Sequence, residues 1–287
     1  MVERRQLGGS EQETALILFL FLSHLGLGIV FTLVFVSREA GVKFFRFNAG
    51  LAAALIAVAL AFRYGALGSV PADSSGTGRL ALIALDCAEA AVVVYWATVG
   101  RALARIRPGI VALAVLAGAM AIVAQALDVS EGRTLPFRVL TVASFVTSAG
   151  LLGGACTAMI LGHWYLVIPS LQVSYLQSIV RVHIGSLVAR IVVVGAAVWF
   201  ALSTGYAAEP LVGPTFRRYI MSVDGIFFWQ RVMFGLAAPA VLSYLTWETA
   251  KIRSTQSATG ILYVDFFTVV VGEVLAKYIV LATHVPV

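Results

Sequence analysis

The chain has 287 residues, of which 60% are hydrophobic and 12% charged, and its mean hydropathy is +0.95. This composition excludes an ordinary soluble domain, because repeated apolar runs close to the length of a bilayer crossing are typical of polytopic membrane proteins. The formal net charge of +6 resides mostly in short loops between apolar runs, where membrane proteins collect Lys and Arg, so it does not indicate a nucleic-acid partner.

Hydropathy over a window of about 19 residues predicts eight transmembrane helices in a single domain that covers residues 1–287. The predicted helices are 14–36, 47–64, 79–99, 109–127, 138–163, 179–203, 225–247 and 259–282. We therefore expect an all-α, polytopic integral membrane protein, and two four-helix bundles are one way to arrange its spans. An even number of spans places both termini on one side of the membrane, here called the terminal face.

The loop charges give the expected orientation. Basic residues divide almost evenly between the two faces, but the loops opposite the terminal face are shorter and more densely basic, which favours both termini outside. Met1–Thr14 do not resemble a cleavable signal peptide. Cys87 and Cys156 lie inside apolar segments, so we expect no disulfide framework and no metal site.

The last predicted helix carries the charges Asp265, Glu273 and Lys277. A charged side chain inside the hydrocarbon costs at least about 2.5–3.5 kcal/mol on insertion scales, so it usually faces a partner, a cavity or a substrate. Glu273 and Lys277 are spaced i,i+4, which places them on one helix face, where they can neutralise each other.

Several further polar residues are predicted to lie in the same half of the membrane as Glu273 and Lys277. A helix rises about 1.5 Å per residue, so the position of a residue within its span gives its depth. The residues at this depth are His24, Asp86, Glu89, Trp229, Gln230 and Arg231. They predict a polar pocket below the terminal face, in which carboxylates and an imidazole exchange protons with an amphipathic molecule such as a quinone. In a second interpretation, Arg231 pairs with Asp86 or Glu89 and the charges only hold helices together.

The opposite half contains fewer polar groups. His163, Trp164 and Tyr165 are typical of an interfacial anchor belt, and Arg181 is placed to extend towards the headgroups. His183 is predicted to lie within about a turn of the interface.

The run Gly272-Glu273-Val274-Leu275-Ala276-Lys277, followed by His284, resembles the last helix of the dimethyl sulfoxide reductase membrane-anchor family. That family belongs to the wider group of polysulfide-reductase-like quinone-binding subunits. Its members tend to carry Gly-Glu-Leu-x-x-Arg, so Lys277 stands where Arg is usual.

Three other segments extend the resemblance. His24, within Leu22–Gly28, stands where the family has Gln, and Glu89 matches a glutamate implicated in quinol binding. Ala66-Leu67-Gly68-Ser69 resembles a Leu-Gly-Ser loop of the family. The family histidine before that loop is absent, and Arg63-Tyr64-Gly65 occupies the region.

The resemblance implies a membrane-anchor subunit of a respiratory oxidoreductase in a prokaryotic cytoplasmic (inner) membrane. Such a subunit binds menaquinone or ubiquinone and exchanges electrons with an extrinsic iron–sulfur subunit, which serves a catalytic subunit of the molybdopterin type. This chain has no cluster-binding cysteines, so we expect it to hold no iron–sulfur cluster. We also expect no haem, because His24 has no histidine partner at its own depth.

The expected roles follow from these residues. Glu89 and His24 accept protons, and Asp86 is a second carboxylate. Arg231 and Lys277 balance charge, and Glu273 pairs with Lys277. Trp229 and Gln230 line the quinone site. On this interpretation, Glu89→Gln abolishes quinol-dependent turnover while the complex still assembles.

Four other functions fit parts of the sequence. A haem anchor would use His163 and His183, which are predicted at similar depth. A retinal protein would use Lys277 as its Schiff base with Asp86 and Glu89 as counter-ions. Intramembrane carboxylates also suit a proton-coupled transporter, and a purely structural subunit of a larger electron-transfer assembly is the fourth alternative.

Overall fold

A computed structural model describes residues 2–67, 76–168, 171–205 and 215–287. The described residues are mainly helical and contain no strand, and eight of their helices are long and apolar enough to cross a membrane. The prediction of an all-α, polytopic integral membrane protein is confirmed. Gly68 and Ser69, which belong to the Leu-Gly-Ser resemblance, lie outside the described residues.

The first six crossings are single helices: α1 (Val2–Leu33), α2 (Gly41–Leu67), α3 (Gly76–Thr98), α4 (Arg107–Val129), α5 (Leu135–Val167) and α6 (Val173–Ser203). The seventh crossing consists of α8 (Ile226–Val232), the π-helical turn η3 (Met233–Ala237) and α9 (Ala238–Lys251), and the eighth is α10 (Thr255–Thr283). The short elements η1 (Arg38–Ala40), α7 (Phe216–Ile220) and η2 (Val223–Gly225) lie in the connections.

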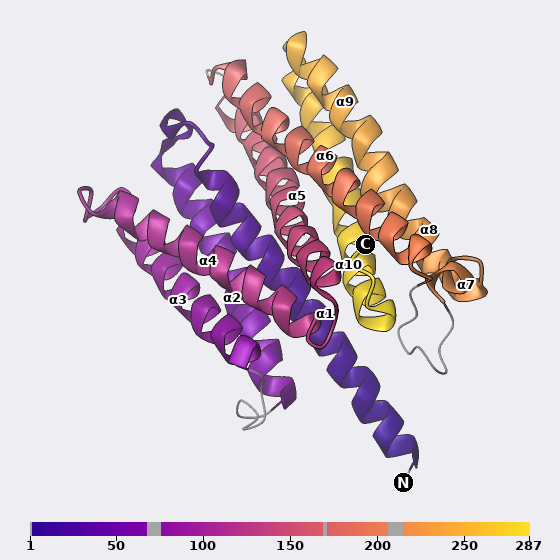
Figure 1. The fold of residues 1–287 in the computed structure, drawn as a ribbon. Coiled ribbons are helices and arrows are strands. Elements are labelled where there is room, and N and C mark those ends of the chain that lie inside the picture. The colour runs from indigo at the N-terminus through magenta and orange to yellow at the C-terminus, as the bar shows by residue number, and fades with distance from the viewer. Residues whose placement is uncertain (1, 68–75, 169–170, 206–214) are drawn as a thin grey trace.

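The crossings form two sets of four (Figure 1). Helices α1–α4 pack against one another, and α5, α6, the α8–α9 crossing and α10 form the second set. Helix α1 packs on α5 where the two sets meet. Side chains on α1, α5 and α10 therefore lie near the centre of the molecule.

A close backbone contact joins α1 to α5. A Cβ on Gly28 would lie 2.1 Å from the carbonyl oxygen of Ala149, and a Cβ on Gly153 would lie 2.0 Å from the carbonyl group of Gly28. One turn away, the hydroxyls of Thr32 and Thr157 are 2.7 Å apart. Small residues at helix contacts are typical of membrane proteins, because they let helix backbones approach closely.

The seventh crossing is interrupted by η3 just before Pro239. The proline lacks a backbone donor, and its ring would clash with the carbonyl four residues earlier, at Gly235. The wider π-helical turn accommodates this local conflict. A Cβ on Gly272 of α10 would lie 2.1 Å from the Cα of Gly235, so the two helices touch here.

After α10, the chain turns back onto the protein. His284 adopts a left-handed conformation with φ 59°, and the side chains of Val285 and Val287 are buried. Burial of the imidazole lowers the pKa of His284, and the neighbouring Arg133 guanidinium lowers it further.

The folded protein therefore binds this proton less readily than the unfolded chain, whose histidines titrate near about pH 6.5. Stability contributed by neutral His284 is present above that pH and is lost as the pH falls towards the lowered pKa of the folded state. We expect the wild-type Tm in detergent to fall between about pH 7.5 and about pH 5.5, and His284→Asn to fall less. Asn tolerates the left-handed conformation. Equal slopes for wild type and His284→Asn would contradict the prediction.

Candidate functional site

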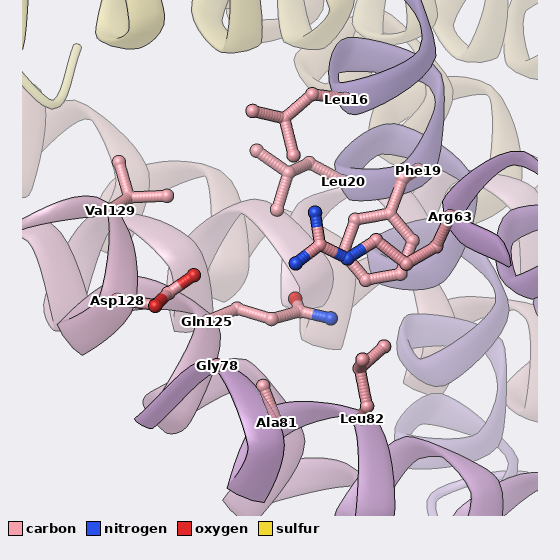
Figure 2. Close-up of a pocket in the computed structure, with 10 residues that line it drawn as sticks. All are labelled: Leu16, Phe19, Leu20, Arg63, Gly78, Ala81, Leu82, Gln125, Asp128 and Val129. Atoms are coloured by element: carbon pink, nitrogen blue, oxygen red, sulfur yellow. The ribbon is translucent and has the colours of Figure 1, made fainter. Parts of the chain in front are cut away.

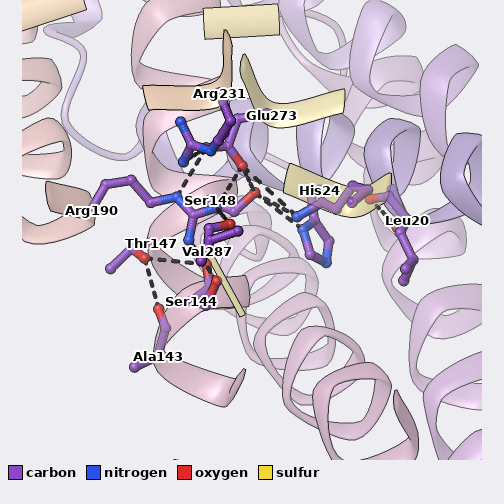
Figure 3. A network of polar contacts seen from close by, with 12 residues as sticks. Leu20, His24, Ala143, Ser144, Thr147, Ser148, Arg190, Arg231, Glu273 and Val287 are labelled. Carbon is purple, nitrogen blue, oxygen red and sulfur yellow. Dashed lines mark hydrogen bonds and ion pairs between the residues drawn. The ribbon is translucent and has the colours of Figure 1, made fainter. Parts of the chain in front are cut away.

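Glu273 is the centre of a buried polar network in the second set of helices (Figure 3). Its Oε1 accepts hydrogen bonds from Arg190 Nε and Arg231 Nη2, each at 2.9 Å. Its Oε2 accepts from Arg190 Nη2 at 3.1 Å and from Ser148 Oγ at 2.5 Å. Arg190 thus donates to both carboxylate oxygens, which is the bidentate geometry that a planar guanidinium favours. We call Ser144, Ser148, Arg190, Arg231, Glu273 and Lys277 the ion cluster.

Lys277 joins the cluster mainly through Ser148. Its Nζ donates to Ser148 Oγ at 2.7 Å and lies 3.9 Å from Glu273 Oε2. The ammonium also lies 4.9 Å from the ring centre of Phe145. The i,i+4 ion pair predicted from the sequence is therefore present, but the two arginines hold the carboxylate more closely than Lys277 does.

Arg190 ties three helices together. Its Nη1 donates to the Ser144 carbonyl oxygen at 3.0 Å and to Ser144 Oγ at 2.6 Å, so it binds α5 as well as α10. Its Nη2 also donates to the main-chain oxygen of Val287 at 3.2 Å. No role was predicted for this arginine from the sequence. The sequence feature that could have indicated a role is its position in the middle of an apolar helix.

The cluster carries more positive than negative side-chain charge. Three cations, Arg190, Arg231 and Lys277, surround the single carboxylate of Glu273, and none of the four side chains is more than 2% exposed. Taking a charge out of water costs several kcal/mol unless it is paired, so removal of Glu273 should be severely destabilising. Gly235 makes room for Arg231, because a Cβ there would lie 2.0 Å from Nη1.

His24 on α1 connects the ion cluster to the first set of helices. Its Nδ1 lies 3.5 Å from Ser148 Oγ, and its ring packs edge-on against Phe145 with centroids 4.9 Å apart. The Gln125 side chain of α4 lies close enough to the imidazole to interact with it. Among the described residues, His24 Nε2 and Gln125 Oε1 are buried atoms without a hydrogen-bond partner.

The hydrogen bonds of Ser148 determine which His24 nitrogen is protonated. A hydroxyl has one proton to donate, and Ser148 donates it to Glu273. A hydrogen bond across the 3.5 Å contact with His24 needs Nδ1–H as its donor, and in that neutral tautomer Nε2 is an acceptor. Gln125 Nε2 donates to Ser23 Oγ at 3.5 Å, so the free atom of its amide is also an acceptor. His24 Nε2 and Gln125 Oε1 are thus neighbouring buried atoms that the described residues leave without a well-aligned hydrogen bond, and a bound group with a donor would satisfy them.

Gln125 also lines a pocket between α1, α2, α3 and α4 (Figure 2). The lining residues are Leu16, Phe19, Leu20, Arg63, Gly78, Ala81, Leu82, Gln125, Asp128 and Val129. Its walls are mostly apolar, with Arg63 placed 5.8 Å from the ring centre of Phe19 and Asp128 opposite in the view. These residues lie towards the terminal-face ends of the helices. Polar groups thus run from the pocket through Gln125 and His24 to the ion cluster.

The structure brings together four of the residues selected from the sequence, namely His24, Arg231, Glu273 and Lys277. Trp229 and Gln230 do not join them, because Trp229 is 52% exposed and Gln230 is also exposed. Consecutive residues of an α-helix point in directions about 100° apart, so burial of Arg231 turns these neighbours outward.

Asp86 and Glu89 lie apart from the ion cluster on α3. Asp86 is exposed and accepts a hydrogen bond from Tyr64 Oη at 2.9 Å. Glu89 is half-buried and lies about 10 Å, or two helical turns, deeper than the pocket residue Leu82. The interpretation in which Arg231 pairs with Asp86 or Glu89 is wrong, because Arg231 donates to Glu273.

In the opposite half, His183 is fully buried, and its Nε2 lies 2.7 Å from Asp265 Oδ2. His183 lies ten residues from the start of its helix and not four, because α6 begins at Val173, six residues before the predicted start at 179. His163 is exposed, and its Nδ1 lies 3.1 Å from Tyr263 Oη. The two histidines of the haem alternative thus have different partners. Within residues 2–67, 76–168, 171–205 and 215–287, no group of three or more His, Cys, Asp and Glu side chains is placed to hold a metal ion.

The fold and the site define an integral membrane protein with a buried ion cluster in one set of helices. In the other set it has a mostly apolar pocket that also contains polar side chains. Comparison of the chain with protein-family models gives no match, and neither does comparison with the sequences of curated proteins.

Proposed function

We propose that the chain is a membrane subunit that binds quinol or quinone in the pocket between α1, α2, α3 and α4. The carrying observation is Gln125 Oε1, a buried atom in the lining of this pocket without a hydrogen-bond partner, next to His24 Nε2, which also lacks one. A quinol hydroxyl supplies the donor that these atoms need, and the mostly apolar side chains of the wall would move apart to admit its ring and tail, because the closed pocket has little more room than a water molecule needs. Menaquinol and ubiquinol share these features.

Oxidation of a quinol releases two protons and two electrons. His24 Nε2 is the acceptor for one proton, and the other proton leaves to water at the terminal-face end of the pocket. The positive charge then formed on the ring lies near Glu273 through Ser148 but also near Lys277, so His24 holds its proton only transiently. Glu273, held by two arginines, acts as a fixed negative charge in this proposal. Arg231 and Lys277 are therefore charge-balancing groups, as the sequence analysis also proposed.

The electrons require an acceptor outside this chain. We propose an extrinsic iron–sulfur subunit that docks on the terminal face, near the pocket, and serves a catalytic subunit of the molybdopterin type. The same proposal places the chain in a prokaryotic cytoplasmic membrane with both termini outside. The charge pattern of the loops and the resemblance of Gly272–Lys277 support these assignments.

Photoaffinity labelling in native membranes tests where quinone binds. An azido-quinone should label peptides from the pocket wall, around Leu16, Leu20, Leu82 and Val129, and excess unlabelled quinone should prevent the labelling. Gln125→Leu should weaken the labelling, because it removes the buried amide while keeping much of its volume. Asp86→Asn is the control, since Asp86 is exposed and bonds to Tyr64. Labelling that quinone does not prevent, or that maps only to α6 and α10, would contradict the proposal.

A further inference from the structure

The buried pair His183–Asp265 belongs to a second polar group that the proposed quinone site does not use. Asp265, His183 and Thr246 are 0% exposed, and Ser243 is 2% exposed. His183 Nε2 and Asp265 Oδ2 are 2.7 Å apart but are not aligned as a hydrogen bond. In the part of the chain that the structure describes, Asp265 Oδ1 and both hydroxyls therefore lack a polar partner, and Asp265 Oδ2 has only the contact with His183.

Helix register places Ser243 at the level of this pair. Gly235, in the same crossing as α9, touches Gly272 of α10. Measured from that contact along the two antiparallel helices, Ser243 lies about 12 Å away and Asp265 about 10.5 Å away in the same direction. On the other side, Gln177 of α6 donates to the Ala250 carbonyl oxygen of α9 at 3.3 Å. From that bond, His183 and Ser243 again lie at nearly equal distances of about 9 and 10.5 Å.

Ser243 and Thr246 are unusual among the buried hydroxyls of this chain. Most others donate to a carbonyl three or four residues earlier in their own helix, as in Thr141, Thr259 and Thr283. Ser243 and Thr246 make no such bond to the described residues. Their i,i+3 spacing puts them on one face of α9, and that face is buried between α6 and α10, which both pack against α9. Both hydroxyls are thus available to a group located beside Asp265.

We propose that Asp265, Ser243 and Thr246 form a binding site for a small monovalent metal cation of the Na⁺ type. Carboxylate and hydroxyl oxygens are the ligands that hard cations prefer. The site has one carboxylate, so one positive charge makes it neutral, whereas a divalent ion would leave a net charge in the interior. His183, placed against Oδ2, is a positioning residue that fixes the carboxylate.

Binding of ²²Na⁺ to the purified full chain in detergent tests this site. At a fixed pH, with choline chloride to hold ionic strength constant, we expect saturable binding to the wild-type chain. Asp265→Asn should abolish the binding. Ser243→Ala and Thr246→Ala should each weaken it by about tenfold, because each removes one oxygen ligand.

Glu248→Gln is the matched control. Glu248 is another carboxylate near this end of the fold, but it is exposed on α9 and pairs with Lys251 at 2.6 Å, so its variant should bind Na⁺ as the wild type does. If Asp265→Asn does not fold, the two hydroxyl variants decide the question. Lack of saturable Na⁺ binding to the wild type would overturn the proposal, and so would unchanged binding in both hydroxyl variants. Either result would mean that His183 alone neutralises the charge of the Asp265 carboxylate.

Discussion

Glu273→Leu should prevent the formation of a stable, monodisperse protein. The change leaves Arg190, Arg231 and Lys277 buried around an apolar side chain, and breaking a buried ion pair from one side costs about 3–5 kcal/mol even where only one cation is left behind. Ser148 would also lose the acceptor of its hydroxyl proton. Size-exclusion chromatography and Tm in detergent measure the effect.

Two further variants show that charge, and not packing, causes this loss. Glu273→Gln keeps the shape of the side chain but removes its charge, so it should also be strongly destabilised. Adding Lys277→Met to Glu273→Gln removes one of the uncompensated cations and should recover part of the lost Tm. A Tm for Glu273→Gln equal to that of the wild type would show that the ion cluster does not stabilise the fold.

Gly153→Ala should separate the two sets of helices. The new Cβ would lie 2.0 Å from the carbonyl carbon and oxygen of Gly28, and backbone atoms cannot move aside as a flexible side chain can. Overpacking of this kind typically costs about 1–3 kcal/mol, and any separation of α1 from α5 also strains the Thr32–Thr157 contact. The expected result is a lower Tm and a longer distance between His24 Nδ1 and Ser148 Oγ.

Gly195→Ala is the control for this prediction. Gly195 also lies within a transmembrane helix, α6, but a Cβ there would meet no described atom within 4 Å. Ala favours an α-helix over Gly by about 0.5–1 kcal/mol, so this variant should be as stable as the wild type or slightly more stable. Equal Tm values for Gly153→Ala and Gly195→Ala would contradict the close contact between α1 and α5.

The eight crossings could be predicted because hydropathy is a local property of the sequence. A long apolar run forms a helix in the bilayer, since its backbone groups must be paired within the segment. The helix ends were less certain. Polar residues such as Gln177 and Ser178 lower the hydropathy without ending a helix, and α6 therefore begins earlier than predicted. That shift places His183 ten residues from the start of its helix, where its side chain is fully buried in the protein.

The site could be predicted only in part, because its contacts join distant segments. The spacing of Glu273 and Lys277 placed both on one face, and depth grouped them with His24 and Arg231. Depth says nothing about direction around a helix, however, so it also selected the outward-facing Trp229 and Gln230. Depth also could not predict which side chains on different helices form pairs.

The roles of Arg190 and Gln125 could not be predicted from the sequence. Arg190 was visible as a lone charge in an apolar helix, but its carboxylate partner lies on α10, more than eighty residues later. Gln125 lacked even that signal, because a single amide in an apolar span has no distinctive pattern. Its place between the pocket and His24 follows from the packing of α4 against α1 and α3.

Quinol-dependent electron transfer by the complex purified from native membranes, compared between two variants, tests the proposed function most directly. His24→Phe keeps an aromatic ring beside Phe145 but removes the acceptor nitrogen, whereas Glu89→Gln changes the carboxylate that the sequence analysis favoured. Loss of a positioned proton acceptor typically slows a reaction by about 100-fold or more. We therefore predict that His24→Phe loses at least this much turnover while its subunits still co-purify, and that Glu89→Gln stays close to wild type. Wild-type turnover in His24→Phe, or a preparation with neither a redox partner nor quinol-dependent activity, would contradict the proposed function.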